Sequence, residues 1–296
     1  MHRKPTIKST FKAFLYLLPA LTIISTFSFY PVVRSLLMSF HTDYNFFTGE
    51  VYSYGIDNFI YIFNDPDFWL AMRNTFLFVV GVVPAAIVIS LGISVLLNSK
   101  IKFRGLFRTI YFIPFVTSVV AISIVWSWIY HSEYGILNYF LGWFGIDPIA
   151  WLIDPAWSMP AIIIMSIWRS LGYNIIIFLA GLQNIDKKYY LAAQIDGASK
   201  WQQFRNITLP LLSPSIFFIS IVSLIGGFKV FDEVFALFDG RPGPVSSALT
   251  IVYYIYEKFY MEWEFGIASA AAYALFVITL AFTLIQMYIG KKKVHY

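Results

Sequence analysis

Six long stretches of apolar side chains follow one another along the chain, and a charged segment separates each from the next. We place them at about residues 13–38, 74–98, 109–130, 156–181, 206–228 and 265–290. A helix that crosses the hydrocarbon core of a bilayer needs about 20 mostly apolar residues. Because lipid offers no partner for backbone N–H and C=O groups, helix is the expected form of each stretch. The pattern predicts an all-α membrane protein with six transmembrane helices, in a single domain over residues 1–296.

The charged segments alternate in sign along the chain. The N-terminus, the C-terminus and the segments at about 100–108 and 186–205 hold 15 of the 21 Lys and Arg residues but 2 of the 16 Asp and Glu residues. An excess of Lys and Arg marks the cytoplasmic side of a membrane protein. We therefore predict that both termini are cytoplasmic. The loops 39–72, 131–154 and 229–264 then lie outside, and each is expected to carry short interfacial helices.

Composition narrows the class of protein further. Hydrophobic residues make up 59% of the chain and charged residues 12%, whereas soluble domains carry about 25% charged residues. This excludes an ordinary soluble enzyme, a disordered chain and a nucleic-acid binder, in spite of the net charge of +5. Without cysteine the chain has no thiol chemistry, and it shows neither a phosphate-binding loop nor a histidine cluster. We expect no enzyme, no metal site and no cofactor in this chain.

The predicted spans contain no Asp or Glu. Intramembrane acids usually mark proton relays and ion sites. Their absence weighs against a proton-coupled transporter, so we expect the energy for any transport to come from a partner.

One basic segment, residues 186–210, has the sequence pattern of two short helices joined by a turn. Asp186 is suited to cap the first helix, and Gly197 is suited to lie just past its end. Ser199 followed three residues later by Gln202 is the pattern of a capping box that opens a second helix.

The first of these two helices carries small residues, Ala192 and Ala193, between Leu191 and Ile195. Small side chains let a helix backbone approach a partner closely, which suits a helix that enters a groove of another protein. The alternative from composition alone is an amphipathic loop that rests on lipid headgroups.

The spacing of this segment resembles the EAA loop of bacterial ABC-importer permeases. Ala192-Ala193 is followed after three residues by Gly197, within Asp196-Gly197-Ala198, and nine residues later by Ile207-x-Leu209-Pro210. One position departs from the family, because Leu191 stands where its glutamate falls. The resemblance implies a loop that couples the permease to an ATPase through Leu191, Ala192, Ala193, Asp196, Gly197, Ala198, Ile207, Leu209 and Pro210.

Further segments resemble the carbohydrate-uptake branch of these permeases, namely residues 108–114, 134–138, 167–174, 181–183 and 265–270. Six spans and a short N-terminus are similar to the glycerol-3-phosphate and oligosaccharide subunits. The resemblance implies a type I importer fold in the bacterial cell membrane. It also implies a second homologous permease subunit, two ATPase subunits that bind ATP and Mg, and an extracellular solute-binding protein.

Candidate solute contacts lie in the fourth and fifth predicted spans. Arg169 lies near the middle of the fourth, where a charge is costly unless it faces a water-filled cavity or a partner. It either lines the solute path or makes a structural contact to carbonyls or to the partner permease. Nearby Asn174 offers an amide. The positions that match the sugar site of the maltose permease, by resemblance, are Trp168, Leu171, Gly172, Ser223 and Gly227. Packing within the membrane is the alternative for each.

These observations predict a permease subunit of an ATP-driven, binding-protein-dependent importer of a sugar or oligosaccharide. A phosphorylated solute such as glycerol 3-phosphate is the alternative, with Arg169 as the counter-charge of the anion. A membrane component without transport activity is a third hypothesis, against which the EAA spacing argues. Residues 238–244 form a turn-rich segment, which is either a plain turn or, by resemblance, the loop that faces the binding protein.

Overall fold

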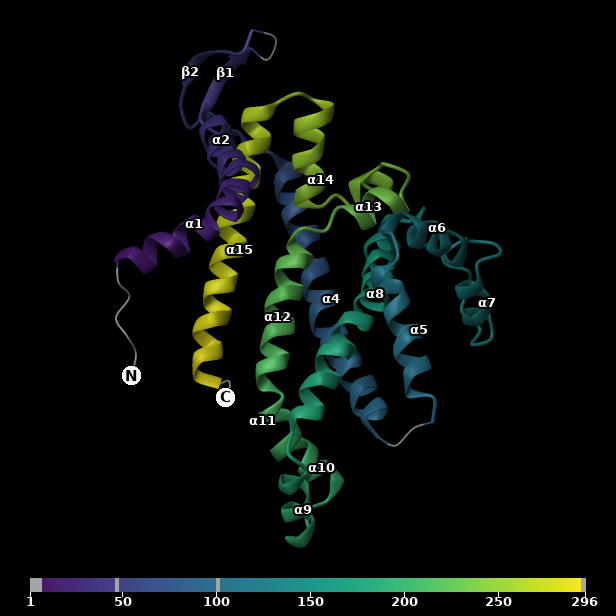
Figure 1. Cartoon of the computed structure of the whole chain (residues 1–296). Coiled ribbons are helices and arrows are strands. Elements are labelled where there is room, and N and C mark those ends of the chain that lie inside the picture. The colour runs from purple at the N-terminus through teal and green to yellow at the C-terminus, as the bar shows by residue number, and fades with distance from the viewer. Residues whose placement is uncertain (1–6, 46–47, 100–101, 294–296) are drawn as a thin grey trace. The chain divides into compact units, whose positions relative to one another are not determined.

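A computed structural model of the chain describes residues 7–45, 48–99 and 102–293, and these are mostly helical (Figure 1). The chain divides into two compact units. Unit 1 comprises residues 1–65 and 255–274, and unit 2 comprises residues 66–254 and 275–296. We describe each unit by itself.

Unit 1 begins with a continuous helical run. Helix α1 (Ile7–Ile24) leads through a π-helical turn, η1 (Ser25–Phe29), into α2 (Tyr30–Met38). A proline in a helix removes one N–H donor and crowds the carbonyl four residues earlier. For Pro31 that carbonyl belongs to Phe27, which lies inside the π turn. Residues Lys12–Met38 of this run are long and apolar enough to cross a membrane.

A β-hairpin follows, which the hydropathy pattern did not predict. Strands β1 (His41–Asn45) and β2 (Glu50–Tyr54) pair antiparallel, and α3 (Asp57–Asn64) comes after them. Asn58 Nδ2 donates to the carbonyls of Ser39 and His41 at 3.0 and 2.9 Å, which holds α3 against the base of the hairpin. Short helices were expected in the loop 39–72, and α3 is one. The hairpin corrects this prediction, because part of the loop forms β-strands.

The later part of unit 1 contains the π-helical turn η4 (Glu257–Met261) and the first residues of α15 (Phe265–Lys293). Lys258 Nζ lies 2.6 Å from Glu262 Oε2 and 3.7 Å from Glu264 Oε2. Burial acts to lower the pKa of Lys258, but the bond to Glu262 outweighs it and the pKa is raised. The ammonium group of the buried Lys258 therefore stays charged beside the two more exposed glutamates.

Unit 2 is organised around two long helices, α4 (Pro66–Asn98) and α8 (Pro155–Asn184), which lie against one another (Figure 1). Ser94 Oγ on α4 donates to the carbonyl of Ile175 on α8 at 3.3 Å. Helix α12 (Ser213–Phe228) packs on α4 where Gly227 meets Val79. Small and hydroxyl side chains at these contacts are typical of helix packing in membranes.

Two of the predicted spans are bent. The third, predicted at 109–130, is divided into α5 (Arg104–Val116) and α6 (Val119–Ile129), whose axes differ by 103°. The extended backbone of Thr117 and Ser118 separates them. The fifth, predicted at 206–228, is straight only from Ser213 and bends by 61° from the helical segment before it. The described part of the chain thus holds four helices able to cross a membrane, or six if each bent pair is one span.

Short helices fill the remaining loops of unit 2, as expected for 131–154 and 229–264. They are α7 (Ile136–Gly142), α13 (Asp232–Leu237), the 3-10 turn η3 (Pro244–Ser246) and α14 (Ile251–Tyr256), the last two residues of which belong to unit 1. Asn138 anchors the loop around α7, because its amide donates to the carbonyl of Ile149 at 2.8 Å and accepts from Trp151 Nε1 at 2.9 Å.

Candidate functional site

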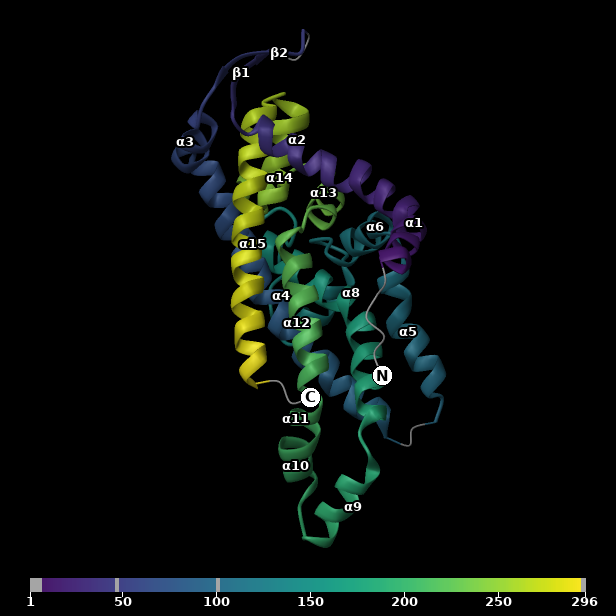
Figure 2. The same ribbon diagram turned by 60° about the vertical axis from the view of Figure 1, so that its left-hand side comes forward.

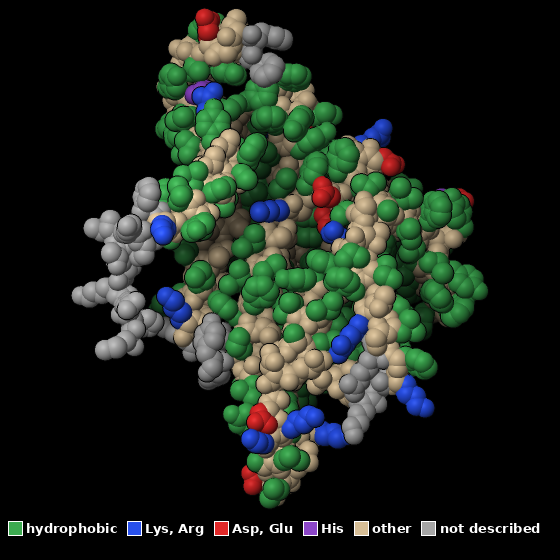
Figure 3. Space-filling view, viewed as in Figure 1, with side chains coloured by type: hydrophobic (Ala, Val, Ile, Leu, Met, Phe, Trp, Pro, Cys, Tyr) green, Lys and Arg blue, Asp and Glu red, His purple; other side chains and the backbone are tan. Residues whose placement is uncertain are grey.

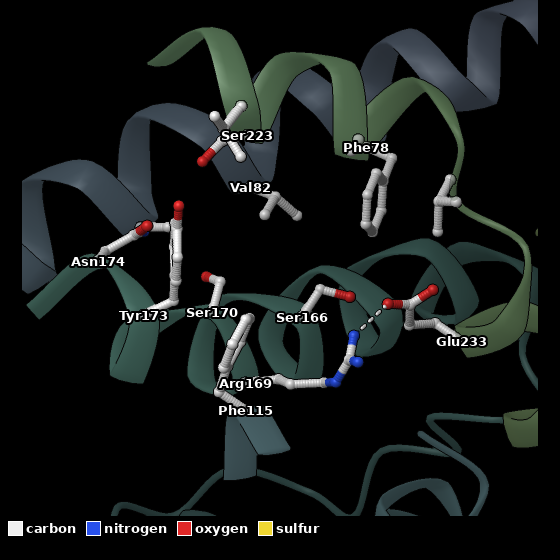
Figure 4. Close-up of a pocket in the computed structure, with 15 residues that line it drawn as sticks. Phe78, Val82, Phe115, Ser166, Arg169, Ser170, Tyr173, Asn174, Ser223 and Glu233 are labelled. Atoms are coloured by element: carbon white, nitrogen blue, oxygen red, sulfur yellow. Dashed lines mark hydrogen bonds and ion pairs between the residues drawn. The ribbon is translucent and has the colours of Figure 1, made fainter. Parts of the chain in front are cut away.

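A cavity of about 220 Å³ opens among α4, α5, α8, α12 and α13 of unit 2 (Figure 4). Helix α4 contributes an apolar wall, α8 contributes most of the polar groups, and α13 contributes one acid. The lining residues are Phe78, Val82, Ala86, Phe115, Ser166, Arg169, Ser170, Tyr173, Asn174, Val222, Ser223, Gly226, Gly227, Val230 and Glu233.

The polar wall comes from one face of α8. Residues three and four apart share a helix face, and Ser166, Arg169, Ser170 and Tyr173 follow that spacing. The ring of Tyr173 is stacked on that of Phe115 from α5, with 5.1 Å between centroids. The cavity therefore combines hydroxyl and amide groups with an aromatic surface.

Arg169 is paired with Glu233 inside this cavity. Its Nη1 donates to Glu233 Oε1 at 3.0 Å, and the side chains are 26% and 15% exposed. Figure 4 shows the two side chains pointing toward each other from α8 and α13. A partly buried charge is tolerated when it is paired and hydrogen-bonded. Arg169 therefore both lines the cavity and makes a structural ion pair within its own chain.

Three polar atoms at the cavity have no hydrogen-bond partner in the described protein, namely Ser166 Oγ, Arg169 Nε and Asn174 Nδ2. Ser166 is 7% exposed and Asn174 is 1% exposed. Buried polar groups in folded proteins are almost always hydrogen-bonded. Groups of this kind that gather at one cavity are suited to bind a ligand with several hydrogen-bonding oxygens.

Four of the residues predicted for the solute path line this cavity: Arg169, Asn174, Ser223 and Gly227. The other three pack elsewhere in unit 2. Trp168 makes an edge-to-face contact with Trp126, 5.5 Å between centroids. Leu171 is buried in a cluster with Leu97, Ile175 and Leu179. Gly172 lies against the backbone of Tyr111 on α5. A solute contact by these three residues stays a prediction.

Several lining residues were missed from the sequence. Ser166 and Tyr173 could have been found, because they lie three residues before and four residues after Arg169, and Ser170 follows Ser166 by four. Glu233 could not, because it lies 64 residues further along the chain, in a segment predicted as a loop, and only the fold brings it to Arg169.

The segment 186–210, the second candidate site, has the predicted local structure. It contains α9 (Lys187–Ile195), α10 (Lys200–Gln203), the π-helical turn η2 (Phe204–Thr208) and α11 (Leu209–Leu211). Asp186 accepts from the backbone N–H of Lys188 at 2.9 Å, so the predicted cap is confirmed. The capping box of Ser199 and Gln202 is confirmed as well, with bonds of 2.7 and 3.3 Å.

The turn between α9 and α10 depends on Gly197, whose φ is +76°. The N–H of Ala198 bonds to the carbonyl of Ala193 at 2.8 Å, and that of Gly197 bonds to the carbonyl of Gln194 at 3.1 Å. These are the two bonds of a Schellman motif, which ends a helix with a left-handed residue. Tyr190 Oη and Thr208 Oγ1, 2.9 Å apart, tie α9 to η2.

Helix α9 has no buried residue, and even its large apolar side chains are exposed: Leu191 is 58% and Ile195 is 87% exposed. Figures 1 and 2 show α9 and α10 extending beyond the ends of α4, α8 and α12. In the space-filling view, charged side chains gather at this end, while hydrophobic ones cover much of the face over α4, α8 and α12 (Figure 3). Of the predicted coupling residues, Leu191, Ala192, Asp196 and Gly197 are exposed, and Ala193, Ala198, Ile207, Leu209 and Pro210 are partly buried.

In unit 2, the membrane-length helices α4 and α8 border a cavity with a polar wall, and a short helix pair projects from one end, an arrangement typical of an integral membrane transport protein. The family is shown by comparison with known sequences. The chain belongs to the binding-protein-dependent transport system inner membrane components, whose family model matches residues 83–295. It is a multi-pass inner-membrane permease of the carbohydrate-uptake ABC transporters and not an enzyme.

Individual relatives match over nearly the whole chain. The lactose transport system permease protein LacF of Rhizobium radiobacter is 39% identical over 284 residues, 94% of each chain. The arabinooligosaccharides permease AraP of Halalkalibacterium halodurans is 38% identical, over 88% of this chain and 82% of its own. Among solved structures, a bacterial alginate ABC transporter in complex with an alginate pentasaccharide-bound periplasmic protein superposes with a TM-score of 0.82. It is 26% identical over 98% of each chain.

The family membership confirms the resemblance on which the sequence hypothesis rested. Permeases of this family carry no cofactor of their own, since ATP is bound by the partner ATPase. No cluster of potential metal ligands occurs within residues 7–45, 48–99 and 102–293. The predicted orientation of the termini stays a prediction, and three of the basic residues behind it, Arg3, Lys4 and Lys100, lie outside the described residues.

Proposed function

We propose that this chain is the transmembrane permease subunit of an ATP-driven importer of a sugar or oligosaccharide and forms half of its translocation path. The observation that carries the proposal is the cavity on α8, where unpartnered Ser166, Arg169 and Asn174 atoms lie beside the stacked Phe115 and Tyr173 rings. Sugar hydroxyls both donate and accept hydrogen bonds, and sugar C–H faces contact aromatic surfaces. The names of the relatives, which transport lactose and arabinooligosaccharides, support the saccharide class.

We propose that α9 and the turn after it couple this permease to an ATPase subunit. Support comes from the exposed apolar side chains of α9, its small residues Ala192 and Ala193, and the Schellman turn at Gly197. A helix without buried residues that displays Leu191 and Ile195 is suited to a groove of a partner protein. Leu191 supplies an apolar contact where a glutamate would supply a polar one.

The complete importer would contain a second homologous permease subunit, two ATPase subunits and an extracellular solute-binding protein. In this arrangement both termini and α9 are cytoplasmic, and residues 238–244 face the binding protein. The charge pattern supports this orientation, since Lys187, Lys188, Lys200 and Arg205 all lie in the segment of α9 and α10.

A labelling experiment tests the orientation. The chain has no cysteine, so single cysteines report on their own positions. In intact cells we expect cysteines at Lys102 and Ser199 to resist a membrane-impermeant thiol reagent, and cysteines at Asp147 and Asp239 to react. Permeabilised cells provide the control, because all four should then react. Reaction at Ser199 in intact cells would contradict the orientation.

Uptake measurements test the solute class. We expect the reconstituted importer, with its own binding protein, to take up a member of a panel of lactose, arabinotriose and trehalose, and not glycerol 3-phosphate. Asn174→Leu removes a buried amide whose Nδ2 has no hydrogen-bond partner. We expect uptake at low solute concentration to fall about tenfold, since one hydrogen bond is worth roughly 1 kcal/mol or somewhat more. Asn184→Leu is the control, because Asn184 is an exposed residue at the end of the same helix. Uptake of glycerol 3-phosphate alone would overturn the saccharide assignment.

A further inference from the structure

The charges at the cavity are balanced within the chain. Among the described residues that line it, Arg169 and Glu233 are the charged ones, and they neutralise each other at 3.0 Å. Their neighbours Lys229 and Asp232 are exposed, are not part of the lining, and carry opposite charges. The cavity therefore presents polar groups without a net charge.

The ion pair occupies one end of the cavity. Figure 4 shows Arg169 and Glu233 at that end, and Tyr173, Asn174 and Ser223 at the other, with Ser170 between them on α8. A solute that fills the cavity would meet neutral hydrogen-bonding groups along most of its length.

Membership of the family does not decide the charge of the solute. The relatives named above include lactose and arabinooligosaccharide permeases, whereas the alginate transporter imports an acidic polysaccharide. An arginine in a transport cavity is the obvious counter-charge for a phosphate or a carboxylate. What matters is whether that arginine is available.

We propose that Glu233 acts as a built-in counter-ion that makes this cavity selective for uncharged saccharides and rejects phosphorylated or uronic acid solutes. This inference rests on the proposed transport function and deepens it. An anion that binds the Arg169 guanidinium must compete with Glu233 at 3.0 Å. If it displaces Glu233, a carboxylate that is 15% exposed is left without its partner, which is costly. If it does not, the anion and Glu233 share one guanidinium and their like charges repel each other.

A neutral saccharide meets neither cost. The ion pair stays intact, and the polar side chains of Ser166 and Asn174 remain to bond to hydroxyl and ring oxygens. Glu233 is therefore a specificity-determining residue that acts through Arg169.

Thiol labelling of the assembled importer measures the charge preference of the cavity directly. Solute uptake alone does not, because the binding protein selects solutes before they reach the permease. We introduce cysteine at Ser223, on the opposite wall of the cavity, into the cysteine-free chain. The probes are sulfonatoethyl methanethiosulfonate, which is anionic, and trimethylammonioethyl methanethiosulfonate, which is cationic. The rate ratio of anionic to cationic reagent is measured by mass spectrometry of this chain and normalised to the ratio for 2-mercaptoethanol.

We expect a normalised ratio near one for Ser223→Cys with the ion pair intact. Adding Glu233→Gln should raise the ratio about tenfold and adding Arg169→Gln should lower it about tenfold, within the range in which charged clefts concentrate ions. The double variant Arg169→Gln with Glu233→Gln should return it to near one. Asp147→Cys, in an exposed loop of unit 2, is the matched control whose ratio should not respond to Glu233→Gln.

Two results would overturn the proposal. One is a ratio that already favours the anion about tenfold with the ion pair intact. The other is a clear fall of the ratio in the double variant, which would show that the native cavity carries excess positive charge even if Glu233→Gln alone fails to assemble. Uptake of a neutral saccharide by the unmodified importer is measured separately, so loss of the transport hypothesis and loss of the charge hypothesis give different results.

Discussion

Replacing Gly172 with alanine will markedly destabilise the permease, although it adds a single methyl group. A Cβ atom at this position would lie 2.9 Å from the Cα of Phe112 and closer still to the carbonyl oxygen of Tyr111. Both are backbone atoms of α5, so no side chain can turn aside to make room. Overpacking of this kind costs roughly 1–3 kcal/mol or more. We expect the thermal midpoint of the purified permease complex to fall by about 2–12 °C, since 1 kcal/mol corresponds to about 2–4 °C for a domain of 150–250 residues.

Gly92→Ala is the matched control for this experiment. Gly92 also lies inside a long helix, α4, but a Cβ there would meet nothing within 4 Å. Alanine is the better helix former, so the midpoint should stay the same or rise slightly. Equal stability of the two variants would contradict the close contact of α5 and α8. If Gly172→Ala instead kept its stability and lost sugar uptake, the solute-path role predicted from the sequence would be favoured over packing.

The long helices could be predicted closely from the sequence. The span predicted at 156–181 is found at Pro155–Asn184, and the one predicted at 265–290 is found within Phe265–Lys293. Lipid requires each spanning helix to be apolar over about 20 residues. The composition of the segment itself therefore shows where such a helix lies. The caps at Asp186 and Ser199 were equally predictable, because they depend on residues two or three positions away.

The bend in the third predicted span could not be predicted from the same information. Residues 109–130 contain no charged side chain, yet the chain turns by 103° between Val116 and Val119. Hydropathy measures how apolar a segment is and not its direction. The hairpin of β1 and β2 was missed for a related reason, because its Thr, Tyr and Asn residues form a short, irregular strand pair in a segment treated only as a loop between spans.

The cavity shows the same division between local and long-range information. Arg169 and Asn174 stood out because a charge or an amide inside an apolar stretch has few explanations. Their neighbours on the same face of α8 follow from helical spacing. Glu233 is different, since its importance comes from a contact with Arg169 that only tertiary packing creates. The net charge of the cavity therefore follows from the packing of α8 and α13 and not from the sequence of either helix.

Substitution of Gly197 is expected to separate ATP hydrolysis from transport if α9 is the coupling helix. Gly197 has φ +76° and open space around its Cα. Valine at this position would clash with no neighbouring residue, but its side chain makes the positive φ unfavourable by roughly 1–2 kcal/mol. The Schellman turn would open and α9 would lose its fixed direction. We expect Gly197→Val to reach the membrane normally and to lose at least about tenfold of its solute-stimulated ATPase activity, since each 1.4 kcal/mol of a lost contact is a factor of ten.

The matched variant is Gly197→Asn, because asparagine tolerates positive φ far better than a β-branched residue does. It adds a larger polar side chain at the same exposed position, yet it should keep most of the stimulated activity.

Ala193→Trp tests the contact surface itself, since Ala193 is a small residue at the end of an exposed helix, and Ala193→Ser is its control. Co-purification of the ATPase with each variant, alongside its rate in reconstituted vesicles, distinguishes loss of binding from loss of signal. Normal stimulated rates in both Gly197→Val and Ala193→Trp would mean that the ATPase engages another part of the permease, and the exposed apolar side chains of α9 would need a different partner.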